Sequence, residues 1–259
     1  MTDLSGKVAV VTGGGSGIGK EICRFFAQAG ATIVIPDINL EDAEGTAQLV
    51  EEQGQKALAM QTDVSRQQDV DHLFLKALSV FGKVDILINN AGVSHPTQSI
   101  LELDTAYVDK VFNVDYKGVY LCSRRAGQEM VKGKGGCILN ISSIAGITPL
   151  PLAMYGPMKS AVNMLTRILA RDLAAQHVRV NAIAPGYVLT PLIQEMIDTG
   201  LRNPDLIIKQ TPMKKMLAPE DVARAALFFC SDNARHITGA VLPIDAGWLS
   251  DGGWAAYNQ

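Results

Sequence analysis

The chain has 259 residues, of which 47% are hydrophobic and 19% charged, a composition that excludes extended disorder. Its formal net charge of -3 argues against a nucleic acid or an anionic membrane surface as a partner. No apolar run is long enough to cross a bilayer, and the first residues lack a signal-peptide pattern, so we expect a cytoplasmic protein. The cysteines and histidines have no metal-ligand spacing, and no metal is expected.

Short apolar stretches rich in β-branched residues alternate with longer stretches of helical periodicity. The expected strands are 7–12, 32–36, 56–61, 84–89, 137–142, 178–184 and 240–244. The expected helices lie near 18–29, 40–53, 66–81, 104–131, 153–175 and 219–230. Several strands are apolar almost throughout, which indicates strands covered on both faces. The alternation predicts an α/β fold: a doubly wound, parallel, seven-stranded sheet (a Rossmann fold) with helices on both faces, in a single domain over 1–259.

A glycine-rich turn at 12–19 follows the first expected strand and opens the first expected helix. Glycines there let backbone N–H groups approach a pyrophosphate at the helix N-terminus, although a plain turn would look similar without this context. Asp37 ends the second strand, where a carboxylate can accept hydrogen bonds from ribose hydroxyls and repel a 2′-phosphate. No Lys or Arg occurs in 13–19, and Ile38 follows the acid. These features predict NAD rather than NADP as the cofactor.

Tyr155 and Lys159 stand four residues apart, which puts their side chains on one face of a helix. A lysine cation favours the ionised form of a neighbouring tyrosine, which can then act as a general base. Pro157 lies between them, but the apolar periodicity continues downstream from Ala161. We therefore expect the proline in the first helical turn, where its missing N–H has little use. A surface pair on an amphipathic helix is the alternative.

The stretch 186–217 interrupts the alternation with three prolines and short helical patterns, and we expect it to be a substrate lid. Beyond the last strand lie four large apolar residues: Trp248, Leu249, Trp254 and Tyr257. They could close the substrate site, pack on a neighbouring subunit, or pack on their own chain.

Seven motifs in one order resemble those of the short-chain dehydrogenase/reductase family, over essentially the whole chain. They are TGxxxGxG at 12–19, Asp63-Val64, Asn89-Asn90-Ala91-Gly92, NVDYKG from Asn113, LNISSIAG at 139–146, the pair Tyr155 and Lys159, and NAIAPGYVLTP from Asn181. The resemblance implies hydride exchange between nicotinamide and an alcohol or carbonyl substrate, with the tyrosine moving the proton. It also implies a homo-oligomer, a tetramer or dimer.

The resemblance implies the catalytic residues Asn113, Ser143, Tyr155 and Lys159, with Asn113 supporting a water chain to Lys159. The implied cofactor-binding residues are Gly13, Ser16, Gly17, Ile18, Gly19, Asp37, Asp63, Val64, Asn90, Ala91, Gly92, Tyr155, Lys159, Pro185, Gly186, Val188 and Thr190. The family's usual spacing points to Ser142 as the serine that orients the substrate, whereas the ISSIAG motif points to Ser143. We favour Ser143, because loops tolerate deletions better than strand ends that aim a side chain.

Sequences with these motifs act on sugars, polyols, sugar acids, steroids, small diketones and acyl chains. We expect His95, Ser143, Tyr155 and Tyr187 to bind the substrate, since they follow the carboxyl ends of strands. Gln194, Glu195 and Arg202 in the lid add hydrogen-bonding groups, which predict a small polyol, sugar or sugar acid. The alternatives are a reductase of a ketone or 3-oxoacyl substrate and a catalytically silent dinucleotide sensor. The sensor would have lost the tyrosine, lysine or serine.

Overall fold

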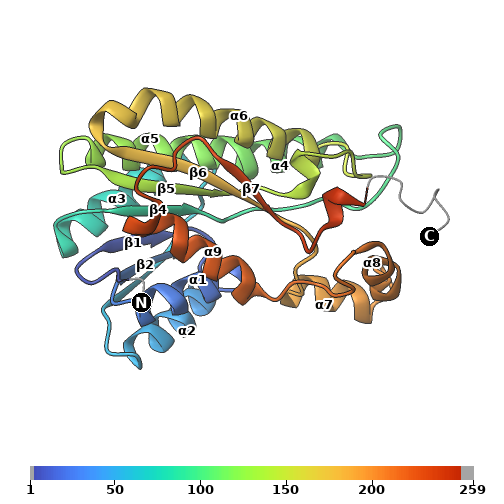
Figure 1. Ribbon diagram of the computed structural model, residues 1–259. Coiled ribbons are helices and arrows are strands. Elements are labelled where there is room, and N and C mark those ends of the chain that lie inside the picture. The colour runs from blue at the N-terminus through green and yellow to red at the C-terminus, as the bar shows by residue number, and fades with distance from the viewer. Residues whose placement is uncertain (1–2, 252–259) are drawn as a thin grey trace.

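The computed structural model describes residues 3–251 and contains a seven-stranded parallel sheet between two layers of helices (Figure 1). The strands are β1 (Val8–Val11), β2 (Thr32–Asp37), β3 (Ala57–Gln61), β4 (Ile86–Asn89), β5 (Gly136–Ile141), β6 (Val178–Pro185) and β7 (Val241–Ile244). They lie in the order β3-β2-β1-β4-β5-β6-β7, and all pairings are parallel. The predicted doubly wound α/β sheet is confirmed.

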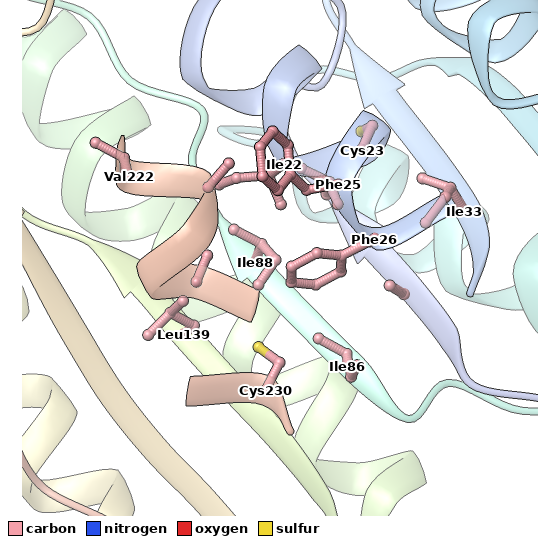
Figure 2. Close-up of a cluster of buried hydrophobic side chains, with 14 of the residues drawn as sticks. Ile22, Cys23, Phe25, Phe26, Ile33, Ile86, Ile88, Leu139, Val222 and Cys230 are labelled. Carbon is pink, nitrogen blue, oxygen red and sulfur yellow. The ribbon is translucent and has the colours of Figure 1, made fainter. Parts of the chain in front are cut away.

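Both faces of the sheet are covered, which explains why several of its strands are apolar almost throughout. Along β4, Ile86 and Ile88 pack into one core with Phe26, whereas Leu87 packs into the other with Phe74. Figure 2 shows the first core, where Phe26 lies between the sheet and the helix that carries Val222. The helices of that face are α1 (Gly17–Gln28), α2 (Leu40–Glu51) and α9 (Pro219–Cys230); those of the opposite face are α3 (Gln67–Phe81), α5 (Val119–Met130) and α6 (Tyr155–Leu173).

The helix expected at 104–131 consists of three continuous parts. They are α4 (Thr105–Val111), a π-helical segment (Phe112–Gly118) and α5 (Val119–Met130). A π-helical turn widens the helix locally and often occurs at a functional site. Here it contains Asp115, whose side chain is fully buried toward α6.

The strand order reverses between β1 and β4, because the chain runs outward from β1 to β3 and then crosses to the other side of β1. At such a point the loops after the two neighbouring strands diverge and leave a crevice at the carboxyl edge of the sheet. The glycine-rich turn follows β1, and Asn90 follows β4. The fold therefore brings two of the sequence motifs to the same crevice.

The stretch 186–217 forms two short helices, α7 (Pro191–Asp198) and α8 (Pro204–Gln210), which lie beyond the carboxyl ends of the strands (Figure 1). A bridge between Val188 and Leu217 joins the two ends of the excursion. Nearby, Trp248 packs edge-on against Tyr187 at 4.9 Å between ring centroids, so this tail residue packs on its own chain. Trp254 and Tyr257 lie outside the described residues. Within 3–251, no helix combines the length and apolarity that a membrane crossing requires.

Candidate active site

A cavity of about 700 Å³ opens in the crevice after β1 and β4. Eleven of the residues expected to bind the cofactor line it: Gly13, Ser16, Gly17, Ile18, Asp37, Asp63, Val64, Asn90, Ala91, Gly92 and Thr190. Gly19 lies beneath the turn, where a Cβ atom would stand 2.1 Å from the carbonyl oxygen of Gly13. The turn is therefore as tightly wound as the binding of a dinucleotide requires. The volume and the lining residues of the 700 Å³ cavity also fit such a ligand.

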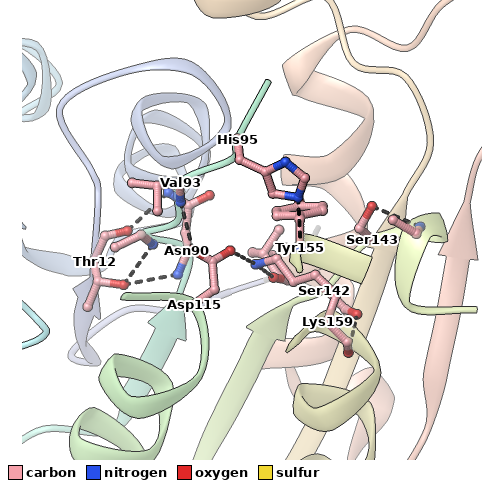
Figure 3. A network of polar contacts seen from close by, with 12 residues as sticks. Thr12, Asn90, Val93, His95, Asp115, Ser142, Ser143, Tyr155 and Lys159 are labelled. Atoms are coloured by element: carbon pink, nitrogen blue, oxygen red, sulfur yellow. Dashed lines mark hydrogen bonds and ion pairs between the residues drawn. The ribbon is translucent and has the colours of Figure 1, made fainter. Parts of the chain in front are cut away.

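The glycine turn is fixed in shape by the segment that follows β4 (Figure 3). The side-chain amide of Asn90 donates to the carbonyl oxygens of Thr12 and Gly13, at 3.0 and 2.9 Å. The Thr12 hydroxyl oxygen accepts from the backbone N–H groups of Asn90 and Ala91, at 3.0 and 3.1 Å. Thr12 was expected only as part of the glycine-rich motif. Its hydrogen bonds join the glycine turn after β1 to the segment after β4.

Asp37 both lines this cavity and supports its glycine turn. One carboxylate oxygen accepts from the Gly15 N–H at 2.9 Å, and the other accepts from the Asn39 N–H at 3.0 Å. A negative charge is thus held at the end of β2. The lining also includes one basic residue that sequence reasoning did not consider, Lys110 from α4.

Tyr155 and Lys159 lie on one face at the start of α6, with the lysine Nζ 5.4 Å from the centre of the tyrosine ring. Lys159 is buried and its Nζ donates to the carbonyl oxygen of Ile141 at 3.1 Å. Pro157 is in the first turn of α6, as the apolar periodicity predicted. The helical hydrogen bonding continues after the proline, since Met158 donates its N–H to the carbonyl oxygen of Met154 at 3.2 Å.

His95 caps the N-terminus of this helix (Figure 3). Its Nε2 accepts from the backbone N–H groups of Met154 and Tyr155 at 3.2 and 3.4 Å, and its Nδ1 lies 2.8 Å from the carbonyl oxygen of Pro96. These partners assign a neutral ring with the proton on Nδ1. The side chain is 5% exposed. The ring nitrogens of His95 are thus occupied within the protein, and a contact between His95 and the substrate stays a prediction.

The carboxylate of Asp115 contacts Lys159 directly, whereas the family resemblance implied only a water chain from Asn113 to this lysine. Asp115 Oδ1 accepts from the Val93 N–H at 2.8 Å, and Oδ2 lies 3.2 Å from Lys159 Nζ in an ion pair. Asn113 instead lines the 700 Å³ cavity. The sequence held a signal for Asp115, since it stands at helical spacing between two buried valines, Val111 and Val119. An acid on an apolar helix face needs a partner.

The ion pair keeps the lysine charged despite its burial. Burial acts to lower the pKa of Lys159, but the charges of Asp115 and Tyr155 act to raise it, and the pKa lies above its ordinary value. Burial of an amine without such a partner would favour its neutral form.

The two candidate serines differ in what their hydroxyl groups do. Ser142 is buried, and its hydroxyl donates to the backbone carbonyl oxygen of Lys159 at 3.3 Å. Ser143 caps a short turn, since its oxygen accepts from the Ala145 N–H at 3.1 Å. Ser143 also lines two smaller cavities that adjoin Tyr155, of about 270 and 210 Å³, whereas Ser142 lines only the first of them. Ser143 thus keeps a hydroxyl proton to donate into the site.

Two further cavities, of about 270 and 210 Å³, adjoin Tyr155. The 270 Å³ cavity shares Ile18, Asn90 and Gly92 with the 700 Å³ cavity and therefore continues it. Its walls also contain six further residues that were expected at the site: Lys159, Pro185, Gly186, Tyr187, Val188 and Thr190. The second reaches under α7 and has a mainly apolar wall: Ile144, Leu150, Pro151, Leu152, Leu192, Ile193 and Met196.

The polar groups that suggested a polyol are distributed differently from expectation. Gln194 and Glu195 are exposed and absent from the walls of both cavities beside Tyr155. Arg202 lines the 210 Å³ cavity and is its one charged residue. Within 3–251, Arg202 has no carboxylate within 4.0 Å. The same range contains no group of three residues arranged to hold a metal ion.

Residues 13–249 match a family model described as enoyl-(acyl carrier protein) reductase, a model of short-chain dehydrogenases/reductases. The chain is 38% identical over 245 residues to cis-4-hydroxycyclohexanecarboxylate dehydrogenase of Sinomonas cyclohexanicum, covering 94% of this chain and 97% of that protein. A solved 7α-hydroxysteroid dehydrogenase, in complex with NADH and 7-oxoglycochenodeoxycholic acid, is 35% identical with a TM-score of 0.88 and 95% coverage of both chains.

A structure from Brucella melitensis 16M, described as a ribose-5-phosphate isomerase, is similar to the same degree. It is 35% identical with a TM-score of 0.94, covering 99% of this chain and 97% of that one. A shared fold does not by itself decide the reaction, which depends on the residues of the site. Taken with the extent of the family match, these observations lead to one conclusion. The chain belongs to the short-chain dehydrogenase/reductase family and is an oxidoreductase that acts on an alcohol or carbonyl group.

Proposed function

We propose that the protein is an NAD-dependent dehydrogenase that interconverts a secondary alcohol on a largely apolar ring and the corresponding ketone. The observation that carries this proposal is that Tyr155 and Ser143 share a cavity with an apolar wall, next to the nucleotide cavity. A substrate hydroxyl bound between these two side chains would have its carbon facing the nicotinamide end of the cofactor.

The residues divide the chemistry as follows. Ser143 donates a hydrogen bond to the substrate oxygen, and Tyr155, ionised beside the Lys159 cation, takes the hydroxyl proton. When bound in the 700 Å³ cavity, NAD would supply the acceptor for the hydride of the carbinol carbon. The C–H and O–H bonds break, a carbonyl forms, and the proton stays on Tyr155 until solvent removes it. For reduction of a ketone or a 3-oxoacyl group, the same residues run in reverse.

NAD is favoured over NADP by the carboxylate of Asp37 at the end of β2. The NADH bound by the 7α-hydroxysteroid dehydrogenase of similar structure supports the same choice. Lys110 is the one feature that favours an additional phosphate, so the cofactor must be tested with both dinucleotides.

An alicyclic substrate fits the site better than the polyol expected from the sequence. A polyol would leave hydroxyl groups without partners against the apolar wall, at about 1–3 kcal/mol for each unpaired group. The hydroxycyclohexanecarboxylate and hydroxysteroid dehydrogenases described above are both named for a hydroxyl group on a carbocycle. Arg202 would pair with a carboxylate on the far side of the ring.

We also propose that α7 and α8 act as a lid. The first of them, α7, carries Leu192, Ile193 and Met196, so closure of the lid would bring apolar surface onto the substrate and exclude water from the reacting carbon. A catalytically silent sensor is disfavoured, because the tyrosine, lysine and serine are all present.

The proposal is tested by following NADH absorbance with a panel of alcohols. The panel holds alicyclic hydroxy acids, neutral alicyclic alcohols, hydroxysteroids, polyols and sugars, each with NAD and with NADP; 3-oxoacyl thioesters and cyclic ketones test the reverse direction. We expect the alicyclic alcohols and NAD to give the highest kcat/KM. Turnover of polyols or sugars alone would refute the substrate class, and no turnover of any compound would refute the activity.

A further inference from the structure

A buried carboxylate lies on the side of Lys159 that faces the π-helical segment. Asp115 is fully buried, and its Oδ2 accepts no well-formed hydrogen bond although it lies 3.2 Å from the lysine Nζ. Gly92 permits this approach, since a Cβ atom there would stand 3.2 Å from Asp115 Oδ2 and 3.5 Å from Lys159 Nζ. The pair thus borders a glycine that lines both the 700 Å³ cavity and the 270 Å³ cavity beside Tyr155.

This arrangement changes what the lysine can do for the tyrosine. Without the Asp115 charge, the Ile141 carbonyl oxygen and the tyrosinate itself would still favour the Lys159 cation. Such a lone cation would favour the ionised tyrosine through its full charge, whereas a cation paired with a carboxylate presents a nearly neutral group. Because both partners are shielded from solvent, water does little to screen the negative charge. Asp115 therefore reduces the help that Lys159 gives to proton removal by Tyr155.

We infer that Asp115, acting through Lys159, sets the pH range of the reaction and places it higher than a neutral residue at this position would. The inference rests on the proposed role of Tyr155 as proton acceptor. Asp115 touches neither substrate nor cofactor in this account, and its role is to position the lysine and its charge.

The other groups around the pair do not provide a competing charge. Tyr155 faces Lys159 from α6, and the carbonyl oxygen of Ile141 faces it from β5. The loop after β4 contributes His95, whose ring is neutral and binds the backbone of Tyr155. Within 3–251, Asp115 is the one carboxylate within 4.0 Å of Lys159 Nζ.

The test is the Asp115→Asn variant, which keeps an oxygen for the Val93 N–H but removes the charge. The pH dependence of kcat/KM for alcohol oxidation should move its acid limb to lower pH by about one unit. A second readout, the ultraviolet absorbance of tyrosinate as a function of pH, does not need activity. The signal of Tyr155 is obtained by subtracting the titration of the Tyr155→Phe variant, once in the wild-type background and once in the Asp115→Asn background. The pH at which Tyr155 ionises should be lower in the Asp115→Asn background.

Asp115→Ser serves as a second neutral variant if the asparagine variant does not fold. Unchanged positions of both the acid limb and the tyrosinate signal in a folded neutral variant would overturn the inference. So would a shift to higher pH. If the wild-type protein oxidised no alcohol, the proposed function would fail, whereas the tyrosinate titration would still decide whether Asp115 opposes ionisation of Tyr155.

Discussion

The backbone N–H of Tyr155 lies 3.4 Å from Nε2 of His95, 60 residues earlier in the chain. The imidazole thus holds the first residue of α6, and with it the start of the helix that carries the phenol and the lysine. In many helices a Ser, Thr, Asp or Asn side chain at the N-cap does this, but the residue before Tyr155 is Met154, which offers no such oxygen.

His95→Leu should therefore lower kcat and loosen the helix start, because two backbone N–H groups lose their acceptor. With about 1–3 kcal/mol for an unpaired buried group, we expect kcat to fall roughly tenfold or more. His95→Gln is the matched control, since an amide oxygen can replace the ring acceptor and should restore much of kcat. Steady-state kinetics and thermal unfolding of both variants check this. Wild-type kcat in the leucine variant would show that the cap is not needed.

Tyr155→Phe should reduce turnover by a factor of about 10²–10⁴, because the proton acceptor is removed. NAD affinity, measured by calorimetry, should remain nearly unchanged. Tyr120→Phe provides the control: this exposed residue of α5 lies outside the walls of the three cavities described above, so its turnover should stay near wild type. Equal effects of the two substitutions would contradict the assignment of the base.

Asp37→Asn should narrow the preference for NAD over NADP, because the charge that repels a 2′-phosphate is removed while an oxygen remains for the Gly15 N–H. The ratio of kcat/KM for the two cofactors is the measurement. Lys110→Gln tests the opposing contribution: it should lower the use of NADP if the lysine reaches the phosphate. An unchanged cofactor ratio in the Asp37 variant would remove the basis for predicting NAD.

Arg202→Gln should raise KM for an alicyclic hydroxy acid by about ten- to a hundredfold, while a neutral alicyclic alcohol is affected little. A charge-assisted hydrogen bond between the guanidinium and a carboxylate contributes on the order of 1.5–3 kcal/mol, which corresponds to that range. Comparing the acid with its amide in both proteins separates the charge from the ring. A similar loss for acid and amide would mean that Arg202 supports the lid rather than the substrate.

The segment 191–210, which contains α7 and α8, should exchange its amide hydrogens more slowly once NAD and a slowly reacting substrate are bound together. Eight of its residues are large apolar side chains, and three of these, Leu192, Leu201 and Leu206, are largely exposed in the present structure. Hydrogen exchange read by mass spectrometry on the free protein, the NAD complex and the ternary complex is the measurement. Identical exchange in all three would exclude a lid.

The sheet, its helices and the position of the 700 Å³ cavity could be predicted because their sequence signals are local. Apolar runs indicate strands, helical periodicity indicates helices, and the glycines before α1 indicate a tight turn. The roles of His95 and Asp115 depend on partners 60 and 44 residues away, at Tyr155 and Lys159. The spacing of Asp115 indicates that it needs a partner, but it does not identify Lys159 as that partner. The motifs did not indicate Asp115 either, because the π-helical turn decides which side chain faces the lysine.

The strand order also bears on how the protein acquires its fold during synthesis. β1 is central, and its second neighbour, β4, begins at Ile86, so one edge of β1 has no hydrogen-bonding partner until that strand has left the ribosome. Up to that point β1, β2 and β3 are a three-stranded unit with an exposed apolar edge, which is a site for wrong pairing. The solubility of nascent chains that end before residue 90 should therefore depend strongly on chaperones. Longer chains, which contain β4, should depend on chaperones much less.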